Sequence, residues 1–179
     1  MTREDFKRFC ALDIDFGSIG LNAPGGTRPP YFCDPVGGEH VGSIGCDGVH
    51  FILLPGDERV FCVDPSMGDV GTYVLPVGEN FREFLSFILY CRDANPLSQI
   101  FWMTEERFRK VLEEDESADW PSAEAYFARK NAALERLASE FDITPAYPYE
   151  KVKVLQATFD GTTLNFTDEY YDVLGIERD

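Results

Sequence analysis

The sequence predicts an α+β protein in which a twisted antiparallel sheet is packed by helices. Three observations support this fold class. Two apolar runs around a tight turn, within residues 49–63, indicate a buried β-hairpin. Residues 81–91 then show the apolar spacing of an amphipathic helix. A helical region and a C-terminal β-hairpin are predicted for the rest of the chain.

The chain has 179 residues, of which 44% are hydrophobic, so it has the size of one domain and can fill a sizeable core. We expect a single domain over residues 1–179, with a central motif at 45–90 and a helical and β-hairpin extension at 92–179. The first residues lack the apolar stretch of a signal peptide, and no apolar run is long enough to cross a bilayer. The sequence therefore favours a cytoplasmic protein.

Residues 1–10 are predicted to form a short helix with Thr2 as its cap. Residues 17–48 are dense in glycine and proline, which indicates a loop with at most short extended pieces. The pair Gly25-Gly26 is not interpreted as a phosphate-binding loop. Such a loop needs a helix directly after it, and Arg28-Pro29-Pro30 does not allow one.

The first hairpin has a definite predicted register. A turn at residues 55–58 pairs Leu53 with Val60 and Phe51 with Cys62. One face then carries Val49, Phe51, Leu53, Val60 and Cys62, and the other carries His50, Ile52, Leu54, Phe61 and Val63. Since both faces are largely apolar, other parts of the chain are expected to cover both.

A third strand is predicted at residues 72–77, where Pro76 suits a sheet edge or a strand end. Asn80 is predicted to cap the helix that follows, with Glu83 placed three residues later as in a capping box. The apolar stripe of this helix is wide enough for burial on more than one side. Its members are Phe81, Phe84, Leu85, Phe87, Ile88, Leu89, Tyr90 and Cys91.

Residues 97–141 are predicted to be helical, with Thr104 capping one helix and a second helix over about residues 122–140. The C-terminal hairpin is predicted from one strand at 151–159, the turn signal Asp160-Gly161 and a return strand at 162–166. Thr167 and Gly175 are expected to bound a last helical turn.

The charge is strongly acidic, with 32 acidic against 16 basic side chains and a net charge of −16. Such a surface repels nucleic acid and anionic membranes, so neither is an expected partner, and it attracts basic proteins. Plain solubility is the alternative explanation of the charge.

The five cysteines are odd in number and widely spaced, and none forms a Cys-x-x-Cys pair. With only two histidines, the sequence predicts no metal site and no cofactor. The cysteines are interpreted as small buried hydrophobic residues.

No catalytic signature is present, and no catalytic residues are predicted. His50 alternates with Ile52 and Leu54 in the predicted strand, which is typical of a core or edge histidine. A nucleophilic pair of His50 with Cys62 or Cys46 is the enzymatic alternative, although no flanking motif accompanies it.

Five carboxylates lie in the loops that end the predicted strands: Asp47, Asp57, Glu58, Asp64 and Asp69. Binding residues concentrate on loop tips held by a rigid sheet, so these five are the candidate partner-binding residues. The alternative is that they cap turns. The run at 113–116 is interpreted as a solvated face.

The central stretch also contains a recognisable order of motifs. Gly45-Cys46-Asp47-Gly48 precedes an apolar strand and a tight turn, a second strand ends in Asp64-Pro65, and Phe81-x-x-Phe84-Leu85 opens a helix. Over about residues 45–90 this order resembles the SUKH superfamily. The resemblance implies an α+β fold and a mostly non-enzymatic interaction protein. Many family members resemble immunity proteins that neutralise toxins, often nucleases, and a fungal branch resembles regulators of cell-wall synthesis.

The sequence leaves three functional hypotheses. The first is an immunity protein whose acidic surface occupies a basic, nuclease-type toxin domain. The second is a regulatory module that binds a peptide or protein through an apolar patch, for instance around Trp102 or Trp120. The third is an enzyme that uses His50 and a cysteine. The oligomeric state stays open.

Overall fold

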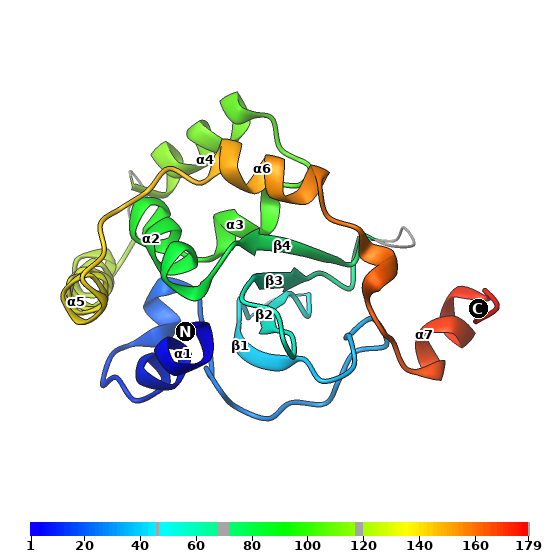
Figure 1. Cartoon of the computed structure of the whole chain (residues 1–179). Helices are drawn as coiled ribbons and strands as arrows, with labels where there is room; N and C mark the ends of the chain where they lie inside the picture. Colours follow the sequence, from blue (N-terminus) through cyan, green and yellow to red (C-terminus); the bar gives the residue numbers. More distant parts are fainter. Residues whose placement is uncertain (46, 68–71, 117–119, 179) are drawn as a thin grey trace.

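A four-stranded antiparallel sheet lies at the centre of the computed structural model, which describes residues 1–45, 47–67, 72–116 and 120–178. The strands follow the chain in the order β1-β2-β3-β4 (Figure 1). They are β1 (Glu39–Ser43), β2 (His50–Leu53), β3 (Val60–Val63) and β4 (Val74–Gly78). Seven α-helices accompany the sheet in the described part, so the α+β prediction is confirmed.

The first hairpin has the predicted register, because β2 pairs Leu53 with Val60 and Phe51 with Cys62. Every residue of β2 and β3 is buried. Their side chains divide between two hydrophobic clusters, with Phe51 in one and Phe61 in the other. The sheet is therefore buried on both faces, as the apolar residues on both predicted faces indicate.

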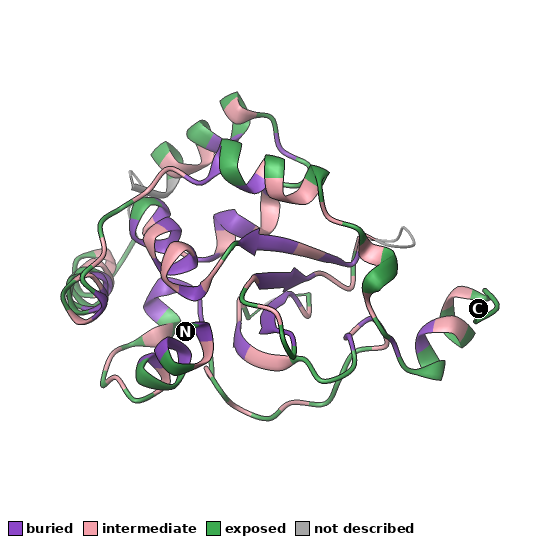
Figure 2. Ribbon diagram, in the orientation of Figure 1, coloured by how far each residue is buried: buried purple, intermediate pink, exposed green. Residues whose placement is uncertain are grey.

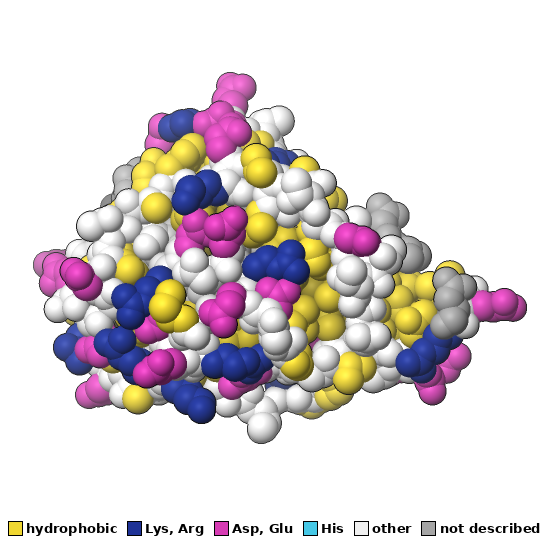
Figure 3. Space-filling view, in the orientation of Figure 1, with side chains coloured by type: hydrophobic (Ala, Val, Ile, Leu, Met, Phe, Trp, Pro, Cys, Tyr) yellow, Lys and Arg dark blue, Asp and Glu magenta, His cyan; other side chains and the backbone are white. Residues whose placement is uncertain are grey.

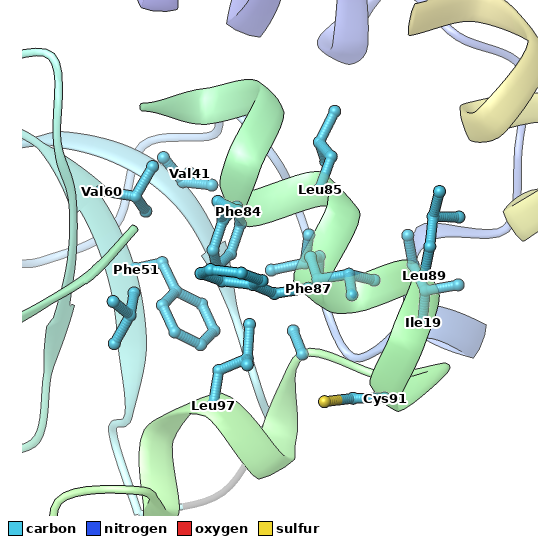
Figure 4. Packing of buried hydrophobic residues seen from close by; sticks show 14 of the residues in the cluster. Ile19, Val41, Phe51, Val60, Phe84, Leu85, Phe87, Leu89, Cys91 and Leu97 are labelled. Atoms are coloured by element: carbon cyan, nitrogen blue, oxygen red, sulfur yellow. The ribbon is translucent and has the colours of Figure 1, made fainter. Parts of the chain in front are cut away.

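Helices cover the first face of the sheet. The helix α2 (Phe81–Cys91) lies against it, and the rings of Phe84 and Phe51 meet with centroids 5.1 Å apart (Figure 4). Figure 2 shows that most of α2 is buried, as its wide apolar stripe predicts. Around it lie α1 (Thr2–Cys10), the 3-10 turn η1 (Phe16–Ile19), α3 (Asn95–Gln99), α4 (Glu105–Glu116) and α5 (Ala123–Phe141).

The predicted cap of α2 is confirmed. Oδ1 of Asn80 accepts a hydrogen bond from the backbone N–H of Glu83 at 3.0 Å, and the Glu83 carboxylate accepts one from the N–H of Glu79 at 2.9 Å. The first bond satisfies a donor that the first turn of the helix leaves free, and the second ties the residue before the cap to the helix. Thr104 likewise caps α4 through its hydroxyl, which accepts from the N–H of Arg107 at 3.3 Å.

The second face is covered by two segments that lie far apart in the sequence. Cys33, from the glycine- and proline-rich stretch, shares a cluster with Phe166 and Tyr170 near the C-terminus. The N–H of Val36 donates to the carbonyl of Asn165 at 2.7 Å and joins the two segments. In Figure 1 the N-terminal chain passes beneath the sheet to reach the C-terminal part. The stretch predicted as loop therefore helps to close the core.

The strand β1 was not predicted as a regular element. It lies in the glycine-rich part of the sequence, and Gly42 is its fourth residue. A Cβ at Gly42 would lie 3.1 Å from Leu21 Cβ, closer than most Cβ contacts, so the approach of the neighbouring chain favours glycine. That chain also covers the outer edge of β1, because Asn22 and Ser43 exchange backbone hydrogen bonds of 2.8 and 3.0 Å.

The predicted C-terminal hairpin is wrong. The chain instead forms α6 (Tyr149–Ala157), the 3-10 turn η2 (Gly161–Thr163) and α7 (Asp168–Leu174). In η2 the Asp160 carboxylate accepts from the N–H and the hydroxyl of Thr162 at 3.0 and 2.6 Å, which turns the chain without a hairpin. The last helix begins after Thr167 and ends at Gly175 with φ 64°, as predicted.

The helix α6 packs along β4, the outer strand on its side of the sheet. Pro76 lies within β4 and offers no N–H to a further strand. A helix can cover such an edge because it needs no ladder of hydrogen bonds. Tyr149 and Val152, three residues apart, are the buried residues of α6.

None of the helices in the described ranges combines the length and the apolar character needed to span a membrane.

Candidate functional site

The structure separates the five predicted acids. Asp57 and Glu58 lie in the turn that joins β2 to β3. Asp47 precedes β2 and Asp64 follows β3, so they lie at the opposite end of these antiparallel strands. Asp69 lies outside the described residues. The four described acids therefore form two groups at two ends of the sheet.

Asp57 is engaged within its own turn. Its carboxylate forms an ion pair with Arg59, with Nη2 and Oδ2 2.7 Å apart, and accepts from the Arg59 N–H at 2.9 Å. Burial alone would raise the pKa of Asp57, but the hydrogen bonds from Arg59 outweigh it and hold that pKa below the ordinary value. Asp57 thus fits the interpretation as a turn residue.

Glu58 holds the start of α1. Its carboxylate accepts from the N–H of Thr2 at 2.8 Å, and its carbonyl accepts from the Thr2 hydroxyl at 2.9 Å. Hydrogen bonds from Thr2 hold the pKa of Glu58 below its ordinary value. The predicted helix is confirmed, but its start is capped by a distant turn and not by the Thr2 side chain as predicted.

Asp64 and Asp47 differ from each other. Oδ1 of Asp64 accepts from the N–H and the hydroxyl of Ser66 at 2.9 and 2.6 Å, which closes a turn after β3. Asp47 is exposed, has φ 51°, and makes no side-chain hydrogen bond or ion pair with any described residue. Asp47 is therefore the one of the four whose carboxylate is free for a partner.

A buried polar cluster lies where β2 begins. His50 is fully buried, as expected of a core histidine. Its Nδ1 donates to the carbonyl of Gly48 at 2.7 Å, and its Nε2 lies 2.9 Å from Oδ1 of Asp34. Oδ2 of Asp34 accepts from Arg28 Nη2 at 2.6 Å and from the Tyr31 N–H at 2.9 Å. Both ring nitrogens of His50 are thus occupied inside the protein.

The Asp34 carboxyl is stabilised as an anion. Burial would raise its pKa, but the hydrogen bond and charge of His50 and the charge of Arg28 outweigh it, so the pKa lies below its ordinary value. Sequence reasoning missed Asp34 and Arg28 because they stand in a loop with no periodicity. The one available signal was that Arg28 and Asp34 are the two charged residues between the glycine pairs 25–26 and 37–38.

His50 does not pair with the predicted cysteines. Cys62 belongs to the cluster on the first face of the sheet. His50 lies two residues before Ile52 and therefore faces the same side as Ile52, which belongs to the cluster on the second face. Burial raises the pKa of the Cys62 thiol, which disfavours the thiolate that a nucleophile needs. Cys33 is on the face of His50, but burial and then Asp34 raise its pKa to about 12. Cys46 lies outside the described residues.

His40 lies close to the cluster. Its ring centroid is 6.0 Å from that of His50, and its Nε2 lies 2.8 Å from the Ser43 hydroxyl oxygen. Burial, and then the nearby His50 and Arg28, lower the pKa of His40. The 2.8 Å between His40 Nε2 and the Ser43 hydroxyl oxygen suits a base and a nucleophile. However, no carboxylate among the described residues forms a hydrogen bond that would orient the His40 ring.

A cleft of about 510 Å³ lies beside this cluster, lined by Arg28, Asp34 and His40 and by two glycine pairs, 25–26 and 37–38. Nε of Arg28 is buried there without a hydrogen-bond partner in the described structure. No group of three His, Cys, Asp or Glu side chains in the described ranges could hold a metal ion.

The two tryptophans differ in their surroundings. Trp120 is 40% exposed and packs on Tyr126 and Phe127, with ring centroids 5.5 and 5.4 Å away. Trp102 is 59% exposed and follows Phe101, which is also exposed. Each is a small apolar feature on an otherwise polar helical region.

Most of the sixteen basic side chains are paired with carboxylates of the same chain. Examples are Arg82 with Asp5 at 2.8 Å and Lys130 with Asp93 at 2.9 Å. Figure 3 shows one face, on which basic and acidic side chains are interspersed over the helical side and hydrophobic ones gather toward the C-terminal side. Because the chain has twice as many acids as bases, many carboxylates are left without an internal cation.

Comparison of the chain with protein-family models, with curated proteins and with solved structures gave no match.

Proposed function

We propose that this chain is a non-enzymatic protein-binding domain, akin to the SUKH immunity proteins, that neutralises a basic, nuclease-type toxin domain in the cytoplasm. The observation behind the proposal is the imbalance of charge described above. The basic side chains are largely paired within the chain, so the net charge of −16 belongs to carboxylates that face solvent. Those carboxylates are available to a basic surface outside the molecule.

A nuclease grips phosphates with clustered lysine and arginine side chains. A protein rich in unpaired carboxylates can occupy the same surface, and the opposite charges speed the encounter. The free carboxylate of Asp47 lies on a tight turn at one end of the sheet. It is the predicted acid best placed to contribute to such an interface.

The histidine geometry favours binding over catalysis. A general base needs a ring nitrogen within reach of a substrate proton, and both nitrogens of buried His50 face protein groups. The cysteine on the neighbouring strand lies on the other face of the sheet. Both observations speak against the enzyme that pairs His50 with a cysteine.

The proposal is tested by recovering the partner from the native host with the tagged full chain as bait. We expect a basic protein that stays bound at about 0.05 M salt and dissociates at about 0.5 M, because surface charge is screened at high ionic strength. Expression of that protein alone should stop growth, and co-expression of this chain should restore it. A neutral or acidic partner, or growth arrest that this chain does not relieve, would contradict the proposal.

A regulatory module that binds through an apolar patch is the second candidate. The exposure of Trp102 beside Phe101 favours it, since exposed aromatic side chains are common at protein interfaces. This candidate predicts a complex that survives about 0.5 M salt. It also predicts that Trp102→Ala abolishes the complex, whereas the acidic-surface proposal predicts little change.

A further inference from the structure

We infer that the groove between α2 and α6 anchors the basic partner, by taking up a segment of that partner in which apolar side chains are flanked by lysine or arginine. This inference rests on the proposed function and adds the place and chemistry of contact. The groove has a volume of about 310 Å³. Its apolar floor lies over the fully buried Phe87 and Val152, and Val154 and half-buried Leu155 give it accessible apolar surface. In Figure 1, α6 crosses the molecule beside α2 and β4.

The open side of α6 carries Val154, one large exposed apolar side chain, among polar residues such as Glu150 and Lys151. Tyr149 and Val152 attach the helix to the core and are buried. Val154 lines the groove and is 62% exposed, and Leu155 beside it is half-buried. A short helix held by one side would ordinarily be polar on the other. The apolar residues on its open side therefore suit a partner's apolar side chain.

Carboxylates line the same groove. Glu79, two residues before α2, and Glu150, in the first turn of α6, are both exposed. Neither forms an ion pair with a cation in the described part of the chain. An apolar floor with free carboxylates at its margin selects for a segment that is both apolar and basic, because an acidic segment would be repelled.

Lys151 shows that a cation fits at this margin. Its ammonium lies 2.8 Å from Oε1 of Glu83, and both residues line the groove. The hydrogen bond to Glu83 raises the pKa of Lys151. Because Lys151 is 65% exposed, the pair is a surface ion pair of small net strength, and a basic side chain of the partner can take its place.

The size of the groove indicates an anchor and not a whole interface. Its volume is near the lower limit of ligand clefts, about 300 Å³, so it can hold one or two large side chains. Interfaces derive much of their affinity from such few buried anchors, with polar contacts around them. The surrounding acids of the chain then supply the rest of the contact.

The test uses the isotope-labelled full chain and a synthetic helical peptide in which leucines at helical spacing are flanked by arginines. A second peptide carries glutamate in place of each arginine. We expect amide shifts upon titration with the basic peptide to concentrate on residues 79–87 and 150–158, and we expect none with the acidic peptide. Shifts spread evenly over the acidic surface, or concentrated elsewhere, would overturn the inference.

Variants at exposed positions separate the groove from general charge attraction. Val154→Ser should weaken binding of the basic peptide about tenfold, since it removes the apolar contact. Val173→Ser is the matched control, because Val173 is 57% exposed on α7 and does not line the groove. Equal affinities of the two variants would overturn the inference.

The acids are tested in the same way. Glu150→Gln should weaken binding about threefold, while Glu135→Gln, at an exposed position of α5, should leave it within error. Lys151→Gln should strengthen binding, because Glu83 is then free for the peptide.

If Glu150→Gln and Glu135→Gln act alike while binding still falls with salt, the groove is not the binding site and the proposed function stands. If the native partner proves neutral, the proposed function fails whatever the peptide does.

Discussion

Asp34 shows how one buried carboxylate can hold a segment that has no regular secondary structure. It accepts hydrogen bonds from Arg28 and from the Tyr31 N–H, and it lies 2.9 Å from His50 on the sheet. Because Arg28 and Tyr31 belong to the glycine- and proline-rich stretch and His50 belongs to β2, the carboxylate ties this stretch to the second face of the sheet.

Replacing Asp34 by asparagine should therefore destabilise the protein by about 3 kcal/mol, since removal of one partner leaves buried charges unpaired. Urea unfolding near neutral pH measures the change. Asp172→Asn, at an exposed position of α7, is the matched control and should change stability by less than about 0.5 kcal/mol. Equal effects of the two substitutions would refute the role given to Asp34.

The loss of stability at acidic pH follows in part from the same carboxylate. The pKa of Asp34 is lower in the folded protein than its ordinary value of 3.8. The stability that ionised Asp34 contributes is therefore complete at pH values above 3.8 and is lost as the pH falls through the lower pKa of the folded protein. The difference in stability between the wild type and Asp34→Asn should shrink over this range.

His40 should make stability depend on pH nearer to neutrality. Its pKa is lowered from the ordinary 6.5, mainly by burial, so the unfolded chain takes up a proton more readily than the folded one. The stability that depends on neutral His40 is then complete at pH values above 6.5 and declines as the pH falls below 6.5. His40→Gln should make the decline between about pH 7 and about pH 5 shallower in urea unfolding. An unchanged slope would contradict this assignment.

At the scale of residues, the sequence allowed a partial prediction of the site. The burial of His50 follows from its alternation with Ile52, and it is confirmed. The contact of Glu58 with Thr2 joins residues far apart in the chain, so no local pattern could reveal it. The same holds for Asp34, whose partners come from a loop and from a strand.

At the scale of elements, the two predicted hairpins had different outcomes for a physical reason. In β2 and β3 both faces are apolar, so only a two-sided buried strand accounts for the pattern, and the turn sets the register. Residues 151–154 alternate polar and apolar side chains, but Tyr149 and Val152 also have helical spacing. The neighbouring edge strand β4 favours the helix, because Pro76 in β4 offers no N–H to a further strand.

Gly161 distinguishes the two conformations in solution. A two-residue hairpin turn at Asp160-Gly161 would require positive φ at glycine, so Gly161→Ala would be costly. In η2, Gly161 does not adopt a positive φ. Gly161→Ala should therefore leave stability unchanged or raise it by about 0.5 kcal/mol. A loss of more than about 1 kcal/mol in thermal or urea unfolding would indicate the hairpin.

At the scale of the whole molecule, the sequence predicted that both faces of the sheet need cover but not what covers the second face. Helices were expected, and they do cover the first face. The second is closed by residues from the glycine-rich stretch and from the C-terminal part, including Cys33 and Phe166. Neither segment has a periodic pattern that points to the sheet, because Cys33 and Phe166 lie in irregular backbone and the short α7 buries only Tyr170.

The charge of the whole molecule leads to the most general prediction. Surplus carboxylates should attract a basic partner over distances longer than a single contact, and dissolved salt should screen that attraction. Single substitutions at one ion pair change little in such a field, because the attraction is a sum over many groups. The rate of association therefore tests the account better than any one variant.

The most direct measurement is the association rate constant of the full chain with its purified partner as a function of ionic strength. Charge-steered association predicts that the rate falls at least about tenfold between about 0.02 M and about 0.5 M salt, while the dissociation rate changes much less. An association rate that stays constant over this range would contradict the claim that the acidic surface recognises a basic protein.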